Sequence, residues 1–229
     1  MTTIAILGGT GKEGPGLALR WASAGYKVII GSRQAEKAQA TAARLNAQLG
    51  TNGIEGMENA EAARMAEISV LTVAHASHQA ALESVREALQ GKLLVDATAR
   101  VDFRDAKPPS PPSAGRIAQD LLGPGVRVVA AFQNVPAHSL GRNLGEQLDC
   151  DVIVCADDLD AAGQVIKLAE GAGMRAYYAG GLDNAIVVEG LTALLIAMNR
   201  HYRSKAAAVQ VTGIERKQGT VGTEGTGAP

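Results

Sequence analysis

Three glycines with the spacing Gly9-x-Gly11-x-x-Gly14 are the first residues of the chain whose pattern points to a particular chemistry. In dinucleotide-binding proteins the first glycine permits a tight turn, the second lets the backbone approach a pyrophosphate, and the third lets a helix pack on a strand. Glycine-rich turns are common, so the flanking segments decide the interpretation. The apolar residues 3–7 predict a buried strand before the turn, and residues 14–24 predict a helix after it. We therefore predict a dinucleotide site at the positive N-terminus of this helix, with a plain structural turn as the alternative.

The residues that follow the second predicted strand, residues 26–30, distinguish between the two nicotinamide cofactors. An NAD site usually has an acidic residue there, which accepts hydrogen bonds from the ribose 2′-OH. This chain instead has Ser32 and Arg33, with Lys37 one helical turn later. A hydroxyl, a guanidinium and an ammonium would all bind a 2′-phosphate, which a carboxylate would repel. The sequence therefore predicts NADP. The alternative is that both cations are solvated charges at the start of a helix.

Two histidines and a glutamine lie just past the strong apolar run at residues 68–74. In open α/β sheets ligands bind beyond the carboxyl ends of strands, so we expect His75, His78 and Gln79 near the cofactor or the substrate. The i, i+3 spacing of the histidines would suit two metal ligands on a helix, but no third ligand is evident nearby in the sequence, and we predict no metal site. A histidine that packs on the nicotinamide or lines the cleft is the favoured interpretation. An exposed residue at a helix N-terminus is the alternative.

Strand-like and helix-like segments alternate from residue 3 to residue 178, which is typical of a doubly wound α/β fold. We predict a Rossmann-type, mostly parallel sheet with a small C-terminal helical domain. A polar cluster at residues 133–137 follows the sixth predicted strand, and is therefore expected at the ligand-binding edge of the sheet. The proline-rich residues 107–113 cannot form regular structure, and are either a surface excursion or a wall of the cleft.

The chain divides into three parts by the character of its segments. Residues 1–180 form the predicted NADP-binding Rossmann domain. Residues 181–214 form the small C-terminal domain, whose segment 185–198 is apolar almost all round and must be covered by the cleft wall, a partner subunit or both. We therefore expect a homodimer. Residues 215–229 are polar and rich in glycine and threonine, which predicts a disordered tail.

Composition limits the kind of partner. The 229 residues suffice for one α/β domain with a small appendage, and 22 basic against 23 acidic residues give a formal charge of -1. This balance favours a small-molecule partner over nucleic acid or an anionic membrane. Cys150 and Cys155 have neither zinc-site nor disulfide spacing, so we interpret them as small core residues. The chain opens on a predicted strand without a signal peptide, and no apolar run reaches membrane-spanning length, so a soluble, cytoplasmic protein is expected.

The sequence resembles the NADPH-dependent reductases of the deazaflavin coenzyme F420 over nearly its whole length, from residue 4 to residue 214. The most specific pieces are LGGTGKEGPGLALR at residues 7–20, GSR at 31–33, VLTV at 70–73, AFQNVPA at 131–137 and LTALLIAMNRHY at 191–202. Together these pieces are far more specific than the glycine motif alone.

The resemblance implies direct hydride transfer between C4 of the nicotinamide and C5 of the deazaflavin, with NADP(H) as cofactor and coenzyme F420 as co-substrate. No catalytic side chain is required, because the protein aligns the two rings and excludes water. The implied cofactor-binding positions are Gly9, Thr10, Gly11, Lys12, Glu13 and Gly14 in the pyrophosphate turn, Ser32, Arg33 and Lys37 at the 2′-phosphate, His75, Gln79, Val101 and Ala137 at the nicotinamide, and Gln133 and Asn134 at the deazaflavin.

Two other functions stay open at this point. Related Rossmann reductases share the N-terminal half, and one that reduces a small imine or keto metabolite would need a proton donor, for which His75 or His78 would be the candidates. An NADP-sensing module without turnover is the third interpretation. An open apolar cleft suited to a second planar ring would favour the deazaflavin enzyme. A small polar pocket with a histidine would favour the metabolite reductase, and a blocked nicotinamide face would favour the sensor.

Overall fold

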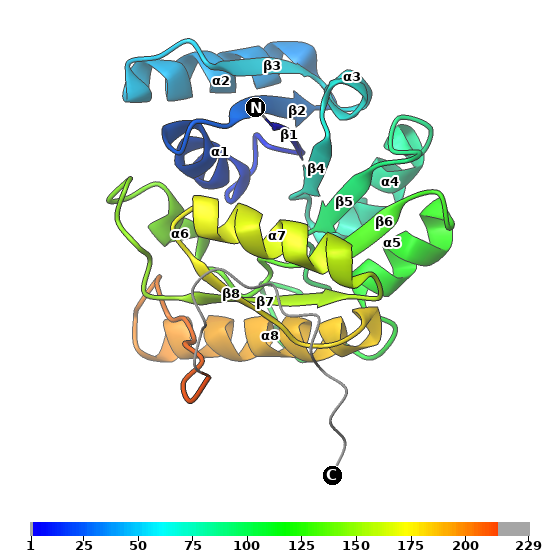
Figure 1. Cartoon of the computed structure of the whole chain (residues 1–229). Coiled ribbons are helices and arrows are strands. Elements are labelled where there is room, and N and C mark those ends of the chain that lie inside the picture. Colours follow the sequence, from blue (N-terminus) through cyan, green and yellow to red (C-terminus); the bar gives the residue numbers. More distant parts are fainter. Residues whose placement is uncertain (1, 215–229) are drawn as a thin grey trace.

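The computed structural model describes residues 2–214, so the predicted tail lies outside the described residues. Eight strands form one sheet in the order β3-β2-β1-β4-β5-β6-β7-β8 (Figure 1). Every neighbouring pair is parallel except β6 and β7. The predicted Rossmann-type, mostly parallel sheet is thereby confirmed. The strands are β1 (Thr3–Leu7), β2 (Lys27–Ser32), β3 (Ile54–Glu58), β4 (Ile68–Leu71), β5 (Leu93–Asp96), β6 (Arg127–Ala130), β7 (Asp151–Ala156) and β8 (Arg175–Tyr178).

Helices connect the strands and cover both faces of the sheet. They are α1 (Gly14–Ser23), α2 (Ala35–Leu49), α3 (Asn59–Met65), α4 (His78–Val85), α5 (Ala114–Leu122), α6 (Ala137–Leu140), α7 (Leu159–Gly171) and α8 (Ala185–His201), with the short 3-10 helices η1 (His75–Ser77) and η2 (Leu182–Asn184). The sequence pattern predicts one helix over residues 76–89, where the chain forms η1 and a shorter α4. It gives no signal for the single turn of α6, which is too short to show a helical period.

Strand β1 shows why the central strands appear in the sequence as continuous apolar runs. Successive side chains of a strand point to opposite faces of the sheet. Ile4 and Ile6 pack with α1, α2 and α7 on one face, whereas Ala5 and Leu7 pack with α3, α4 and α5 on the other. All four side chains are buried, as expected where helices cover both faces. Polar chemistry is therefore confined to the strand ends and the loops that follow them.

Helix α8 packs one side against the rest of the chain and leaves another side exposed. Glu189 and Thr192 are buried, whereas Val187 and Leu194 are 71% and 56% exposed. The segment Leu182–His201 has 20 residues and a mean hydropathy of 1.4, so by length and composition alone it could cross a membrane. The prediction that no apolar run reaches that length is therefore wrong. One such helix is weak evidence for a membrane, because a helix that covers a protein core passes the same test.

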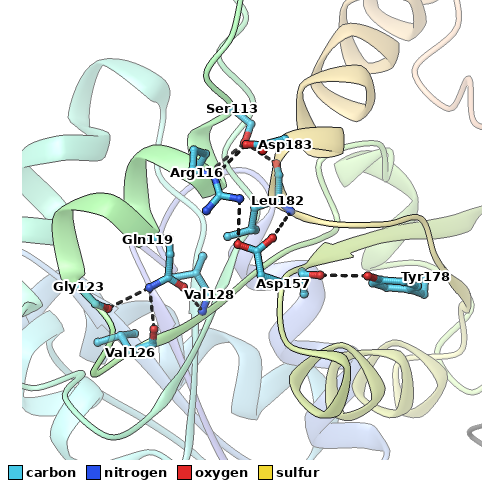
Figure 2. Close-up of polar contacts among 11 residues, drawn as sticks. Ser113, Arg116, Gln119, Gly123, Val126, Val128, Asp157, Tyr178, Leu182 and Asp183 are labelled. Carbon is cyan, nitrogen blue, oxygen red and sulfur yellow. Dashed lines mark hydrogen bonds and ion pairs between the residues drawn. The ribbon is translucent and has the colours of Figure 1, made fainter. Parts of the chain in front are cut away.

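A polar cluster fixes the start of α8 to the sheet (Figure 2). Ser113 caps α5 by accepting a hydrogen bond from the N–H of Arg116, and its Oγ donates to the carbonyl of Leu182 at 2.8 Å. The Arg116 guanidinium binds Asp157 after β7 and Asp183 in η2, each at 2.8 Å. Asp157 also accepts a hydrogen bond from the N–H of Leu182. These contacts hold α5, β7 and η2 together, and so set the direction in which α8 leaves the sheet.

The proline-rich segment between β5 and α5 is tied to α8. Glu189 of α8 accepts hydrogen bonds from the N–H of Arg100 at 2.9 Å and from the N–H of Ala114 at 2.6 Å, at the two ends of the segment. The Arg100 guanidinium donates to the carbonyls of Ser110 and Pro112 within it. Of the two interpretations open for this segment, a surface excursion and a wall of the site, these contacts favour the wall.

Candidate functional site

The carboxyl ends of four neighbouring strands meet at one edge of the sheet. Strand pairing aligns Leu7 with Leu71, Leu71 with Asp96, and Asp96 with Ala130, which are the last residues of β1, β4, β5 and β6. The glycine turn, the two histidines, the segment after Asp96 and the polar cluster after β6 follow these four ends. Segments far apart in the sequence therefore converge where open α/β sheets bind their ligands.

Each of the three positions in the turn requires glycine for a different physical reason. A Cβ on Gly9 would lie 2.6 Å from the carbonyl oxygen of Ile6, and a Cβ on Gly14 would lie 2.6 Å from the Cα of Gly9. The backbone of the chain itself therefore requires these two glycines. A Cβ on Gly11 would have no described atom beyond its chain neighbours closer than 3.5 Å. Packing within the protein does not explain Gly11, whereas the close approach of a pyrophosphate does.

Asn59, the buried first residue of α3, holds the glycine turn from behind. Its Oδ1 accepts a hydrogen bond from the N–H of Gly8 at 3.1 Å. The carbonyl of Gly31 accepts a second one from the N–H of Gly9 at 2.9 Å. Sequence reasoning missed Asn59, and the only signal available was a polar residue at the start of a short helix. The turn is therefore fixed by β2 and α3 as well as by its own glycines.

The N-terminal end of α1 offers hydrogen-bond donors to an anion. Within residues 2–214 the backbone N–H groups of Thr10 and Lys12 have no acceptor, and they adjoin the positive end of the helix. Glu13, the N-cap residue, has a buried Oε1 without a hydrogen-bond partner among these residues. Burial raises the pKa of Glu13 to about 8. At neutral pH the carboxyl is therefore mostly protonated, and can donate to a phosphate that a carboxylate would repel.

Ser32, Arg33 and Lys37 lie at the end of β2 and the start of α2. Ser32 is buried, and its Oγ accepts a hydrogen bond from the N–H of Gln34 at 3.3 Å, which leaves the hydroxyl hydrogen free to donate. Arg33 and Lys37 are exposed, and within the described part of the chain neither side chain forms an ion pair or a hydrogen bond. Two cations without an ion pair among the described residues, and one hydroxyl, are therefore available at the position where a dinucleotide carries its adenosine ribose.

Four charged side chains at the end of β5, which we name the β5 cluster, are His78, Asp96, Arg100 and Glu189. His78 Nε2 lies 2.6 Å from Asp96 Oδ2, with the two side chains 3% and 0% exposed. Burial by itself would lower the pKa of His78, but the hydrogen bond to Asp96 and the charges of Asp96 and Glu189 outweigh burial and raise it. Burial also raises the pKa of Glu189. Sequence reasoning missed Asp96 and Glu189, because only the fold brings them to His78.

The other residues predicted on the nicotinamide side are His75, Gln79, Val101 and Ala137, which come from four different segments. His75 and Gln79 are exposed, and the Gln79 amide donates to Glu83 within α4 at 2.9 Å. Burial and the charges of Arg100 and His78 lower the pKa of His75. Val101 is buried beside Arg100, and Ala137 begins α6. The resemblance placed His75 at the nicotinamide and left His78 out, whereas the structure makes His78 the histidine held in a buried pair.

The loop after β6 is held in an unusual conformation. Phe132 has a φ of 74°, which is rare for a bulky residue, and its buried ring packs edge-on against Trp21 with 5.8 Å between ring centroids. The Nε2 of the next residue, Gln133, donates to the carbonyl of Asp96 at 3.2 Å. The carbonyl of Gln133 accepts a hydrogen bond from Thr192 Oγ1 at 2.9 Å. The loop is therefore locked to β5 on one side and to α8 on the other.

Asn134, in the same loop, is bound to β7. Its Nδ2 donates to the carbonyl of Asp151 at 2.7 Å, and its Oδ1 accepts from the N–H of Ile153 at 3.4 Å. Both ends of the amide therefore anchor the loop. The Gln133 Oε1, by contrast, is buried and has no partner among residues 2–214. The contacts of both residues with a deazaflavin stay predictions.

Cysteines and metal ligands add nothing to the site. Cys150 and Cys155 are free and buried, and burial raises the pKa of each thiol to about 11. Both thiols are therefore neutral near pH 7 and poor nucleophiles. Within residues 2–214, no group of three His, Cys, Asp or Glu side chains could hold a metal ion.

Comparison with known proteins identifies the family. The family model described as NADP oxidoreductase coenzyme F420-dependent matches residues 3–100. A protein named F420-dependent NADP reductase from Methanothermobacter thermautotrophicus is 40% identical over 227 residues, covering 94% of this chain and 97% of the relative. The chain belongs to the F420-dependent NADP reductase family. A relative of the same name from Methanocaldococcus jannaschii is 38% identical, covering 93% of this chain and 99% of its own length. The resemblance inferred from the sequence motifs is therefore confirmed.

Solved structures agree with this assignment. The crystal structure of a protein from Arthrobacter sp. FB24, provisionally assigned as an F420-dependent NADP reductase, matches with a TM-score of 0.78 at 26% identity. The match covers 93% of this chain and 100% of that chain. A pyrroline-5-carboxylate reductase from Coxiella burnetii has a TM-score of 0.58 at 15% identity, covering 88% of this chain and 70% of that one. At 15% identity the likeness shows the shared fold alone.

Proposed function

We propose that this reductase-family chain transfers a hydride between NADP(H) and coenzyme F420. The observation that carries the proposal is the similarity of nearly the whole chain to two proteins named as reductases of this pair. The glycine turn supports it independently, because Gly11 has no packing reason within the protein and a dinucleotide supplies one.

The residues at the carboxyl edge fit NADP(H). The free N–H groups of Thr10 and Lys12 and the positive end of α1 suit a pyrophosphate. The Ser32 hydroxyl and the uncommitted cations of Arg33 and Lys37 suit a 2′-phosphate. The nicotinamide would then lie farther along the same edge, over the ends of β4 and β5. This placement rests on the order of the strands in the sheet.

Hydride transfer between two ring systems requires contact and exclusion of water rather than a nucleophile. When bound, NADPH supplies a hydride from C4 of its nicotinamide, and C5 of the deazaflavin accepts it. The chain fixes the loop that would hold the second ring through the contact of Phe132 with Trp21 and the hydrogen bond of Gln133 to Asp96. Helix α8 closes that side through Thr192, which limits the access of water.

A direct assay tests the proposed function. Purified protein mixed with NADPH and oxidised F420 should bleach the deazaflavin absorbance at a rate that saturates with both compounds. A parallel titration should follow NADPH binding by fluorescence. Tight NADPH binding with no F420 turnover would contradict the proposal, and turnover of a small cyclic imine in the same preparation would favour the metabolite reductase instead.

The exposed face of α8 supports a homodimer. Val187, Leu194 and Met198 are 71%, 56% and 46% exposed, and their spacing places them on one side of the helix. We propose that a second copy of the chain covers this face. Leu194→Glu should convert a dimer to a monomer in sedimentation velocity, because a carboxylate would be buried without a partner. Met65→Glu, at a residue 50% exposed in α3, is the matched control. A monomeric unmodified protein would refute the proposal.

Other properties expected from the sequence stay predictions. These are the domain boundary near residue 180, the cytoplasmic location, and the lack of nucleic-acid and membrane partners.

A further inference from the structure

We propose that the β5 cluster makes the preference of the site for oxidised over reduced NADP depend on the protonation of His78. The inference rests on the proposed function, because that function brings the nicotinamide to the edge where the cluster lies. His78 is not required to touch the cofactor. It acts as a residue that sets the local charge, and so as a determinant of specificity between the two forms of one cofactor.

The position of the cluster follows from the strand register. Asp96 ends β5 and is aligned with Leu71 at the end of β4, so it lies at the edge that receives the nicotinamide. His78 begins α4 directly after η1, which follows β4, and Arg100 lies in the segment after β5. Glu189 joins them from α8 by accepting the N–H of Arg100 at 2.9 Å. The cluster is therefore built from four separate parts of the chain around one strand end.

The net charge of the β5 cluster depends on the protonation of His78. The groups that act on His78 are Asp96, Glu189 and Arg100. With His78 protonated and both carboxyl groups ionised, the two positive and two negative charges cancel; because burial raises the pKa of Glu189, this count applies once Glu189 has lost its proton. With His78 neutral, one negative charge is left over. The neighbouring His75 has a lowered pKa, so with falling pH it gains its proton only after His78 has done so.

The two forms of the cofactor respond to this charge differently. The oxidised nicotinamide ring carries one positive charge, whereas the reduced ring is neutral. A buried site screens charges weakly, so an extra negative charge on the cluster favours the oxidised ring and leaves the reduced ring nearly unaffected. By linkage, binding of NADP+ should release a proton from His78, and binding of NADPH should not. The overall reaction, NADPH plus oxidised deazaflavin plus one proton giving NADP+ plus reduced deazaflavin, is balanced without any further reactant.

The decisive quantity is the ratio of the dissociation constants of NADP+ and NADPH. Both forms carry the same 2′-phosphate, so its titration cancels in the ratio. Calorimetric titrations from about pH 5.5 to about pH 9 bracket the ordinary histidine pKa of about 6.5. In the unmodified protein the ratio should fall about three- to tenfold in favour of NADP+ as the pH rises, an order-of-magnitude expectation for one partly buried charge. In His78→Gln the ratio should be constant, whereas the exposed His201→Gln should behave like the unmodified protein.

A second measurement does not depend on the stability of a variant. Titrating the unmodified protein with NADP+ in two buffers of different ionisation enthalpy counts the protons released on binding. A release with NADP+ that exceeds the release with NADPH, by a difference that peaks near the pKa of His78, supports the proposal, because Glu13 and the 2′-phosphate contribute equally with both forms. A constant ratio in the unmodified protein, or a pH dependence that survives in His78→Gln, overturns it. Neither result would affect the proposed function, which would instead fail through a lack of NADP binding or of F420 turnover.

Discussion

Replacing Arg33 with alanine should weaken the binding of NADP far more than that of NAD. Arg33 is exposed and forms no ion pair or hydrogen bond within residues 2–214, so its removal should not disturb the fold. What is lost is a charged hydrogen bond to the 2′-phosphate, which contributes about 1.5 to 3 kcal/mol. Since about 1.4 kcal/mol corresponds to a factor of ten, the dissociation constant of NADP should rise about tenfold to 150-fold.

Calorimetric titration of the Arg33→Ala protein with NADP and with NAD provides the measurement. Lys37→Ala is the matched variant, because its ammonium is also exposed and uncommitted but binds as a point charge without the planar fork of arginine, and it should cost less. An unchanged melting temperature in both variants would show that the fold is intact. Equal losses of affinity for NADP and NAD would refute the reasoning, since NAD has no 2′-phosphate.

Two further predictions concern stability. The pKa of Glu13 is raised from 4.5 to about 8, so the unfolding free energy of the protein should fall as the pH rises between these values. In urea unfolding, the unfolding free energy of Glu13→Gln minus that of the unmodified protein should therefore be at least about 1 kcal/mol larger at pH 9 than at pH 5. The same difference at both pH values would contradict a raised pKa for Glu13. The buried Arg20 donates hydrogen bonds to the carbonyls of Leu140, Arg142, Glu146 and Ala172. Arg20→Met should destabilise the protein by about 3 kcal/mol or more, whereas the exposed Arg44→Met should stay within about 0.5 kcal/mol; similar losses in the two would show that these bonds contribute little.

Local patterns predicted most of the sheet because helices cover both of its faces. Strand β4 buries every side chain and β1 all but its first, and their apolar β-branched runs stand out in the sequence. The same patterns could not show that β7 turns antiparallel to β6, because strand direction depends on the path of the connecting loop. They also could not separate a helix that covers a core from a membrane-length helix. Leu182–His201 is apolar enough for either, and its buried polar residues Glu189 and Thr192 show which side packs on the rest of the chain.

Local sequence patterns likewise predicted one part of the candidate site and could not predict the other. The glycine turn and the Ser32-Arg33 pair are contiguous in sequence, and their spacing carries the chemistry. The β5 cluster is not contiguous, since Asp96 and Glu189 come from a strand and a helix that only the fold brings to His78. A buried carboxylate in an apolar helix is a usable signal even so. It is costly without partners, and the sequence alone therefore indicates that some donors must meet it.

Helix α8 joins the two proposals about assembly and chemistry in one element. Its inward side carries Glu189, bound to Arg100, and Thr192, bound to the loop at Gln133. Its outward side carries Val187 and Leu194, which a second copy of the chain would cover. A helix packed on both sides cannot shift without breaking the hydrogen bonds at the site. Dimer formation should therefore hold the β5 cluster and the loop after β6 in place, and a monomeric variant should bind the deazaflavin more weakly even though the substitution lies on the opposite side of the helix.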